Sequence, residues 1–128
     1  MSLLDSPSSG CRVLVADDDR DHADSLVDML RAWGFSAQAV YDGDEAILAD
    51  ELLQPRLVLM DIRMPRLDGY SAATMIRQAS PARQVRLVAL TGSDSDMAPD
   101  LSASVGFDDF ITKPIGRARL HLLALEAR

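Results

Sequence analysis

Short apolar runs rich in branched residues alternate along this sequence with longer stretches in which apolar residues recur at helical spacing. Continuous apolar runs of this length are typical of strands that are buried on both faces of a parallel sheet. The predicted strands are residues 12–16, 57–60, 86–90 and 109–111, with a less apolar strand over residues 36–40 at an edge of the sheet. Strand and helix alternate five times, which predicts an open α/β fold of three layers with right-handed crossovers.

The helical stretches each place their apolar residues on one stripe, which is the pattern of a helix that packs against a sheet. The predicted stripes consist of Ala23, Leu26, Val27, Leu30 and Trp33; Ala46, Ala49 and Leu53; Ala72, Met75, Ile76 and Ala79; and Leu120, Leu123, Ala124 and Ala127. Gly34 is predicted to end the first helix and Asp44 to cap the second. A sparser stretch over residues 96–105, followed by Gly106, predicts the loosest helix.

The chain of 128 residues is long enough for one domain with its own core, and 48% of its residues are hydrophobic. We assign residues 11–128 to that domain and residues 1–10 to a tag remnant and polar linker. The single cysteine, Cys11, cannot form an internal disulfide, so it is predicted to be a small buried hydrophobe in a protein of a reducing compartment.

The formal net charge of −7 disfavours direct binding to nucleic acid or to an anionic membrane surface, because both carry negative charge. No apolar run approaches the roughly 20 residues of a membrane span, and the N-terminus lacks the pattern of a signal peptide. These observations predict a cytoplasmic protein that contacts neither nucleic acid nor membrane directly.

Reactive residues follow several of the predicted strands, at the point where each strand ends. Asp17 and Asp18 follow the first strand, Asp61 follows the third, Thr91 the fourth and Lys113 the fifth. In open α/β folds, sites form beyond the carboxyl ends of the strands. We therefore expect these five side chains to meet in one site.

Clustered carboxylates repel one another, which raises the pKa of at least one of them unless a cation compensates. A hard divalent ion such as Mg²⁺ (or Mn²⁺) suits a set of oxygen ligands. Asp61 beside that ion can attack phosphorus and form an aspartyl phosphate. Lys113 would neutralise the developing charge, while the hydroxyl of Thr91 and the backbone N–H of Gly92 would donate hydrogen bonds.

Four stretches resemble the signatures of response-regulator receiver domains from two-component signalling, in the same order and spacing. They are residues 13–18, 61–69, 90–92 and 112–114. The resemblance extends from about Cys11 to the end of the chain. It implies a flavodoxin-like (βα)5 fold with strand order 2-1-3-4-5 and a histidine kinase or histidine phosphotransfer domain as the phosphoryl donor.

The resemblance also implies a role for each residue of the site. Asp61 is the phospho-acceptor, Asp18 is a metal ligand assisted by Asp17, and the carbonyl of Arg63 is a further metal ligand. Lys113 pairs with a phosphate oxygen, and in the family its bond to the following proline is cis. Such a protein is a signalling domain that catalyses its own phosphorylation and dephosphorylation, and we do not class it as an enzyme.

A switch is expected from the same residues. Thr91 would move toward the phosphoryl group on Asp61, and Phe110, at the family's aromatic position, would turn into the space that Thr91 leaves. The surface that responds would span residues 96–127. Gly92 replaces the small residue usual after the threonine, which would ease the movement.

Two other functions are compatible with parts of the pattern. A phosphatase of the haloacid-dehalogenase type also uses an aspartyl phosphate, but it requires a second aspartate two residues after the nucleophile, where this chain has Arg63. A degenerate receiver would act as an interaction module without phosphorylation, and the complete set of site residues argues against it. A dinucleotide or P-loop site is excluded because no Gly-rich loop follows the first strand.

The wider context is less defined by the sequence. Residues 85–92 and 21–26 resemble receivers joined to hybrid histidine kinases, which leaves open a linked kinase or output domain, and a homodimer is also compatible. Asp19 and Asp21 are assigned to the start of the first helix. The two histidines, His22 and His121, are predicted to lie at the surface or its boundary, and we assign them no chemistry.

Overall fold

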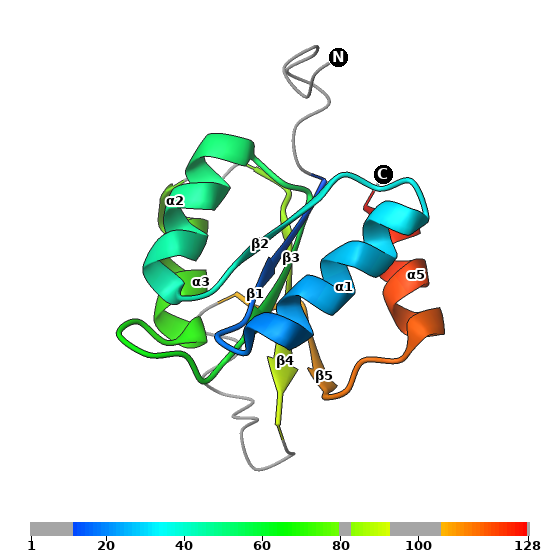
Figure 1. The fold of residues 1–128 in the computed structure, drawn as a ribbon. Coiled ribbons are helices and arrows are strands. Elements are labelled where there is room, and N and C mark those ends of the chain that lie inside the picture. The colour runs from blue at the N-terminus through cyan, green and yellow to red at the C-terminus, as the bar shows by residue number, and fades with distance from the viewer. Residues whose placement is uncertain (1–11, 80–82, 93–105, 128) are drawn as a thin grey trace.

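The computed structural model describes residues 12–79, 83–92 and 106–127, and in them it forms a five-stranded parallel sheet. The strands are β1 (Val13–Ala16), β2 (Ala37–Val40), β3 (Leu57–Asp61), β4 (Arg86–Thr91) and β5 (Asp109–Thr112). Their order is β2-β1-β3-β4-β5, with every neighbouring pair parallel (Figure 1). The predicted fold class and strand order are confirmed, including the edge position of β2.

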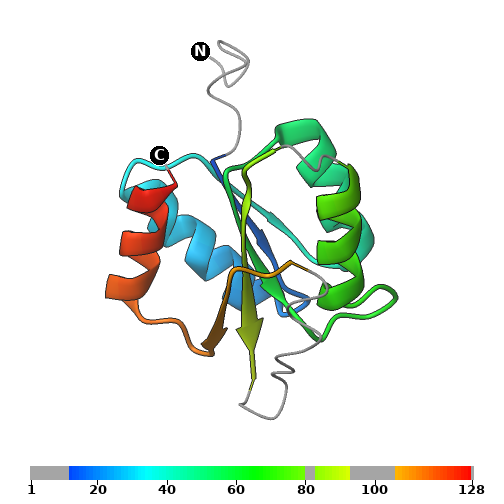
Figure 2. The same ribbon diagram turned by 180° about the vertical axis from the view of Figure 1, so that it is seen from behind.

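Four helices cover the sheet within the described residues, namely α1 (Arg20–Ala32), α2 (Gly43–Leu53), α3 (Gly69–Ala79) and α5 (Arg117–Glu126). Helices α1 and α5 lie on one face, and α2 and α3 lie on the other (Figures 1 and 2). This gives the three layers that the alternating pattern predicts. The helix predicted over residues 96–105 and the burial of Cys11 lie outside the described residues.

Each face of the sheet has its own apolar core, because successive side chains of a strand point to opposite faces. In β1, Val13 and Val15 join the core under α1 and α5, whereas Leu14 and Ala16 join the core under α2 and α3. All four are fully buried, and β3 and β4 divide their side chains in the same way. The strands are therefore held on both faces, which fixes the positions of their ends.

Helix α1 begins and ends as the sequence predicts. The side chain of Asp19 caps it by accepting a hydrogen bond of 3.2 Å from the backbone N–H of His22, and Asp21 lies in the first turn. Its last turn closes at Trp33, and Gly34 follows with a φ of 94°, a left-handed conformation that glycine adopts without strain. The start of α1 is thus fixed directly beyond the end of β1.

Two predictions about the helices are wrong. The cap of α2 is Asp42, which accepts a 2.8 Å hydrogen bond from the backbone N–H of Glu45, and Asp44 lies inside the helix. On α3 the buried residues are Gly69, Ala72, Ala73 and Ile76, whereas the predicted stripe residues Met75 and Ala79 are exposed. A stripe that follows 72, 73 and 76 turns the small alanines toward the sheet and leaves Met75 on the outer side.

None of the helices in the described part of the chain has the length and apolar character needed to cross a membrane.

Candidate functional site

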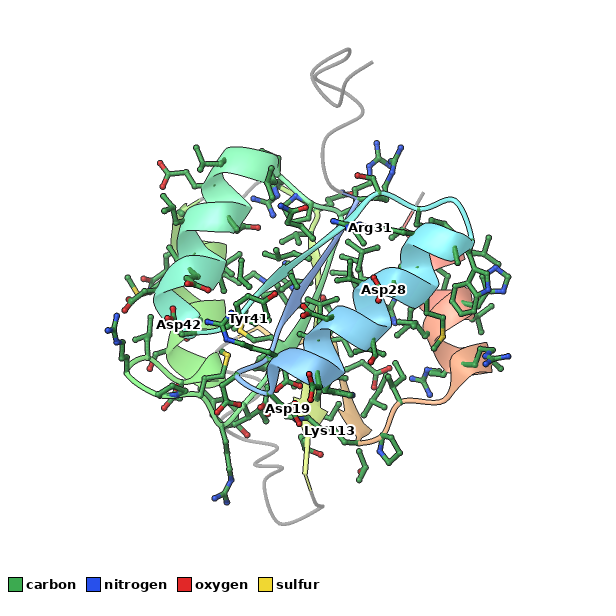
Figure 3. The ribbon with its side chains drawn as sticks, viewed as in Figure 1. Asp19, Asp28, Arg31, Tyr41, Asp42 and Lys113 are labelled. Carbon is green, nitrogen blue, oxygen red and sulfur yellow. The ribbon has the colours of Figure 1, made fainter. Side chains whose placement is uncertain are left out.

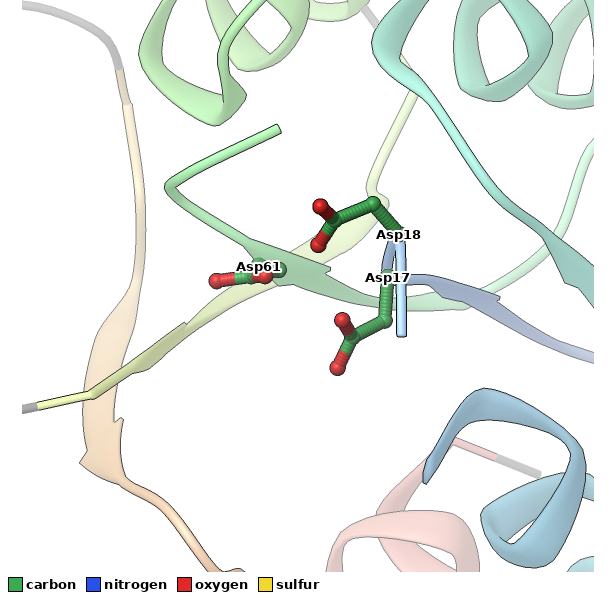
Figure 4. A group of neighbouring side chains, drawn as sticks. All are labelled: Asp17, Asp18 and Asp61. Carbon is green, nitrogen blue, oxygen red and sulfur yellow. The ribbon is translucent and has the colours of Figure 1, made fainter. Parts of the chain in front are cut away.

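Three carboxylates meet where β1 and β3 end (Figure 4). Asp17 follows the last residue of β1 and Asp61 is the last residue of β3, and because Ala16 pairs with Met60, the two aspartates come level on neighbouring strands. One oxygen from each of Asp17, Asp18 and Asp61 lies within 4.8 Å of the other two. Asp17 and Asp61 are buried, whereas Asp18 is exposed, so the group opens to solvent on one side.

Lys113 supplies the positive charge of the site. Its Nζ lies 3.1 Å from Oδ2 of Asp17 and 3.2 Å from Oδ2 of Asp61, so that it bridges the two buried carboxylates. The residue follows β5 directly, its backbone N–H donates to the carbonyl of Thr91, and its bond to Pro114 is cis. Figure 3 shows Lys113 at the same end of the sheet as Asp19, the cap of α1.

The pKa values of these groups reflect their burial and their neighbours. Burial raises the pKa of Asp61 from its ordinary 3.8 to about 6, and the charge of Asp17 adds to this rise, while Lys113 opposes it. Burial alone would raise the pKa of Asp17 as well, but hydrogen bonds from His22, the backbone of Asp19 and Lys113 outweigh it and lower the pKa. Burial would lower the pKa of Lys113, yet its two carboxylate partners hold it above the usual value.

Asp17 has further hydrogen-bond partners at the start of α1. The backbone N–H of Asp19 donates to its Oδ1 at 3.0 Å, and Nδ1 of His22 lies 2.6 Å from its Oδ2. The half-buried position of His22 agrees with its prediction as a boundary residue, but its contact with the acidic group was missed. The sequence signal for this contact is the position of His22 in the first turn of a helix that begins shortly after Asp17. The first turn of such a helix lies beside the end of the strand.

Thr91 ends β4, the strand beside β3, and it is fully buried. Its hydroxyl has no hydrogen-bond partner among the described residues, although buried polar groups are nearly always paired. Gly92 follows it and is exposed. A ligand oxygen bound at this end of the sheet would give the Thr91 hydroxyl the partner that it lacks.

The loop after β3 is held against Asp61 by a glycine. A Cβ atom at Gly69 would lie 2.5 Å from the carbonyl oxygen of Asp61, so a larger residue does not fit without movement of the backbone. The Gly69 N–H donates to the carbonyl of Ile62, and the backbone N–H of Arg63 lies 3.3 Å from Oδ1 of Asp61. The side chain of Arg63 is exposed at this loop.

Phe110 lies in β5 and is half-buried. Its ring packs edge to face on Phe107 with centroids 5.5 Å apart, and Phe107 packs in the same manner on Tyr70 at 5.9 Å. The second histidine, His121, packs on Trp33 with ring centroids 4.5 Å apart, on the face of the sheet that α1 and α5 cover. His121 therefore belongs to the packing of two helices.

The donor set at the strand ends fits a hard divalent cation. The three candidate side-chain ligands are carboxylates, which suit Mg²⁺ or Mn²⁺, and their oxygens are close enough to share one ion. A divalent ion would also offset the repulsion that raises the pKa of Asp61.

Comparison with known proteins places the chain in a family. The sequence model of the response regulator receiver domain matches residues 13–124. The transcriptional regulatory protein PrrA of Mycobacterium leprae is 37% identical over 117 residues, which are 91% of this chain and 49% of that protein. The DNA-binding response regulator MtrA of Mycobacterium tuberculosis is 36% identical over 103 residues, which are 80% of this chain and 44% of that protein. The chain spans about half the length of these regulators.

Solved structures agree with this placement. One similar structure is the receiver domain of a sensor histidine kinase from Pseudomonas aeruginosa, which has a magnesium ion coordinated in its active-site cleft. It superposes on this chain with a TM-score of 0.79 at 32% identity, and the superposed region covers 91% of this chain and 96% of that one. A response regulator from Clostridium difficile, at 23% identity, shares the fold with a TM-score of 0.80 over 91% of this chain and 94% of that one. On its sequence and its fold, the chain belongs to the family of response-regulator receiver domains of two-component systems.

Proposed function

We propose that this receiver domain accepts a phosphoryl group on Asp61, in the presence of Mg²⁺, from the phosphohistidine of a histidine kinase or a histidine phosphotransfer domain. The observation that carries the proposal is the position of Asp61, which is buried at the end of β3 with Asp17 and Asp18 beside it and Lys113 at 3.2 Å. The magnesium ion in the related receiver from Pseudomonas aeruginosa supports the same donor set.

In the proposed reaction, an oxygen of the ionised Asp61 attacks phosphorus and forms a P–O bond. The P–N bond to the donor imidazole breaks, and the imidazole keeps the electron pair and takes up a proton. A bound Mg²⁺ would be held by Asp18 and Asp61, with Asp17 assisting and the Arg63 carbonyl as a further ligand, and it would neutralise phosphoryl charge. Lys113 would turn its Nζ to a phosphoryl oxygen, and Thr91 would donate its unpaired hydroxyl.

The proposed response couples Thr91 to Phe110. The unpaired hydroxyl of Thr91 gains a partner when it moves toward the phosphoryl group, and the ring of Phe110 takes the space that it leaves. Phe110 is only half-buried, so turning inward would bury more of its apolar surface. The surface over residues 96–127, of which the structure describes residues 106–127, would change with it, through a shift between two pre-existing states.

Intact-mass spectrometry of the protein after incubation with a small acyl phosphate and Mg²⁺ tests the acceptor. We expect one phosphoryl adduct on the wild type and on Asp68→Asn, an exposed aspartate of the loop after β3, and no adduct on Asp61→Asn. An adduct on Asp61→Asn would show that another residue is the acceptor. An unmodified wild type would favour the alternative of a degenerate receiver that acts as an interaction module.

Arg63→Ala is expected to shorten the lifetime of the phosphoaspartate several-fold. The backbone N–H of Arg63 contacts the Asp61 carboxylate, so the exposed side chain of Arg63 starts close to the acyl phosphate. Removing that side chain opens the approach of water to the acyl phosphate. The rate is measured by loss of the adduct after removal of the phosphodonor. Arg66→Ala, an exposed arginine of the same loop, is the control, and an equal lifetime in all three proteins would contradict the role.

The regulators that this chain matches are about twice as long as the matched region. MtrA is named a DNA-binding response regulator, and this chain spans about half of it, so we propose that residues 11–128 form the phospho-accepting half of a longer cytoplasmic protein. With a net charge of −7 this half would not bind DNA itself. The alternative is a linked kinase, since the similar receiver from Pseudomonas aeruginosa belongs to a sensor histidine kinase.

A further inference from the structure

Among the described residues, Asp17 has more hydrogen-bond partners than either other carboxylate of the site. Its Oδ1 accepts from the backbone N–H of Asp19 at 3.0 Å, and its Oδ2 lies 3.1 Å from Nζ of Lys113 and 2.6 Å from Nδ1 of His22. The side chain of Asp17 is fully buried, so these donors replace the water that an exposed carboxylate would have. Its orientation is therefore set by the protein.

The contact with His22 has a defined direction. An ionised carboxylate offers only acceptors, so the hydrogen of the short contact belongs to Nδ1, and His22 donates. The imidazole is fixed in turn by the helix, because the backbone N–H of the same residue donates to the capping Asp19 side chain. His22 thus connects the cap of α1 to a carboxylate of the acidic group.

Lys113 differs from His22 because it serves two carboxylates. Its Nζ lies between Asp17 at 3.1 Å and Asp61 at 3.2 Å, and in the proposed reaction it turns to a phosphoryl oxygen on Asp61. Oδ2 of Asp17 then keeps one of its two side-chain donors, His22. A buried carboxylate oxygen that lost both donors would be costly, and it would be free to rotate away from the ion.

We propose that His22 is a positioning residue of the metal site, which holds the Asp17 carboxylate toward the divalent ion and keeps it there when Lys113 turns to the phosphoryl group. The role rests on the proposed function, because it concerns the same ion. Partners that hydrogen-bond metal-binding carboxylates typically change metal affinity by about 10- to 100-fold when they are removed.

Titration calorimetry of the full chain with Mg²⁺ alone tests the role. We expect His22→Ala and His22→Leu, which both remove the donor, to raise the Mg²⁺ dissociation constant about tenfold. His22→Asn should restore affinity close to that of the wild type, because its amide nitrogen can take the place of Nδ1. His121→Ala removes the histidine that packs on Trp33 and should leave Mg²⁺ binding unchanged.

The outcomes separate this role from the proposed function. Wild-type affinity in both donor-free variants, or an Asn variant as weak as they are, would overturn the role while leaving phosphorylation of Asp61 intact. A wild type that binds no Mg²⁺ and takes no phosphoryl group would instead overturn the function. Unfolding midpoints of the metal-free variants identify any that fail to fold, and the second donor-free variant then decides.

The second part of the role concerns Lys113. In a Lys113→Met background Asp17 has lost one side-chain donor, so removal of His22 should weaken Mg²⁺ binding by a larger factor than in the wild type. An equal factor in both backgrounds would show that His22 does not substitute for the lysine.

Discussion

At neutral pH and without divalent metal, Asp61→Asn is expected to be more stable than the wild type by about 3 kcal/mol. Asp61 is 6% exposed and lies beside a second buried carboxylate, and these two effects raise its pKa to about 6. Ionising it at pH 7 therefore disfavours the folded state, even with Lys113 at 3.2 Å. Asparagine has nearly the same shape and carries no charge, so it removes the repulsion without leaving a cavity.

The pH dependence of this difference has a definite sign. The folded state holds the Asp61 proton more tightly than the unfolded chain, whose carboxyl has the ordinary pKa of 3.8. The wild type therefore loses stability relative to Asp61→Asn as pH rises from about 4 to about 6, and the full difference is present above that range. Urea unfolding in the presence of a chelator, at several pH values from 4 to 8, measures it.

Asp28→Asn is the matched control, because it removes one negative charge from an exposed aspartate of α1. It should shift stability by less than about 0.5 kcal/mol, as surface substitutions usually do. Saturating Mg²⁺ should then reverse the order, since an ion held by the carboxylates stabilises the wild type more than Asp61→Asn. Equal stability of the wild type and Asp61→Asn at pH 7, with or without Mg²⁺, would contradict this prediction. It would show that the ionised Asp61 does not destabilise the fold and that the ion does not offset its charge.

The sequence predicts the strand ends better than it predicts what surrounds them. Runs of buried apolar residues define β1, β3 and β4, and parallel strands bring their carboxyl ends to one edge, so the meeting of Asp17 and Asp61 follows from the pattern alone. The residue at which a helix begins, and with it the direction of each side chain, is predicted only to within one or two residues. That uncertainty explains why the pattern indicates Asp44 as the cap where the structure has Asp42, and why it does not predict the contact of His22 with the site.

Contacts between residues far apart in the sequence leave no local pattern. The guanidinium of Arg77 on α3 donates to the carbonyls of Val85 and Gly106 and to the side chain of Asp108, and so holds the segments before β4 and β5. Arg83 donates to both oxygens of Asp50, 33 residues earlier. The sequence alone predicts that both arginines lie in solvent, since Arg is mostly exposed in folded proteins.

The ion pair of Arg83 and Asp50 lies between α2 and the segment that leads into β4. Nη1 of Arg83 lies 2.9 Å from Oδ2 of Asp50, its Nη2 donates to Oδ1, and the same nitrogen lies 3.3 Å from the carbonyl of Pro55. The side chain of Asp50 is only 5% exposed, so in a variant without Arg83 little water would replace the lost partner of its charge. Breaking a buried pair on one side typically costs about 3 to 5 kcal/mol, because it leaves an uncompensated charge.

Arg83→Met is therefore expected to lower the free energy of unfolding by about 3 kcal/mol, whereas Asp50→Leu should cost less. The difference arises because the long side chain of Arg83, which is 18% exposed, can turn its charge to solvent, while Asp50 cannot. The double variant Asp50→Leu/Arg83→Met, which buries no charge, should recover most of the loss. Urea unfolding of the three variants and the wild type measures these differences. If the double variant lost as much free energy of unfolding as the two single variants together, the two side chains would contribute independently and the charge argument would be wrong.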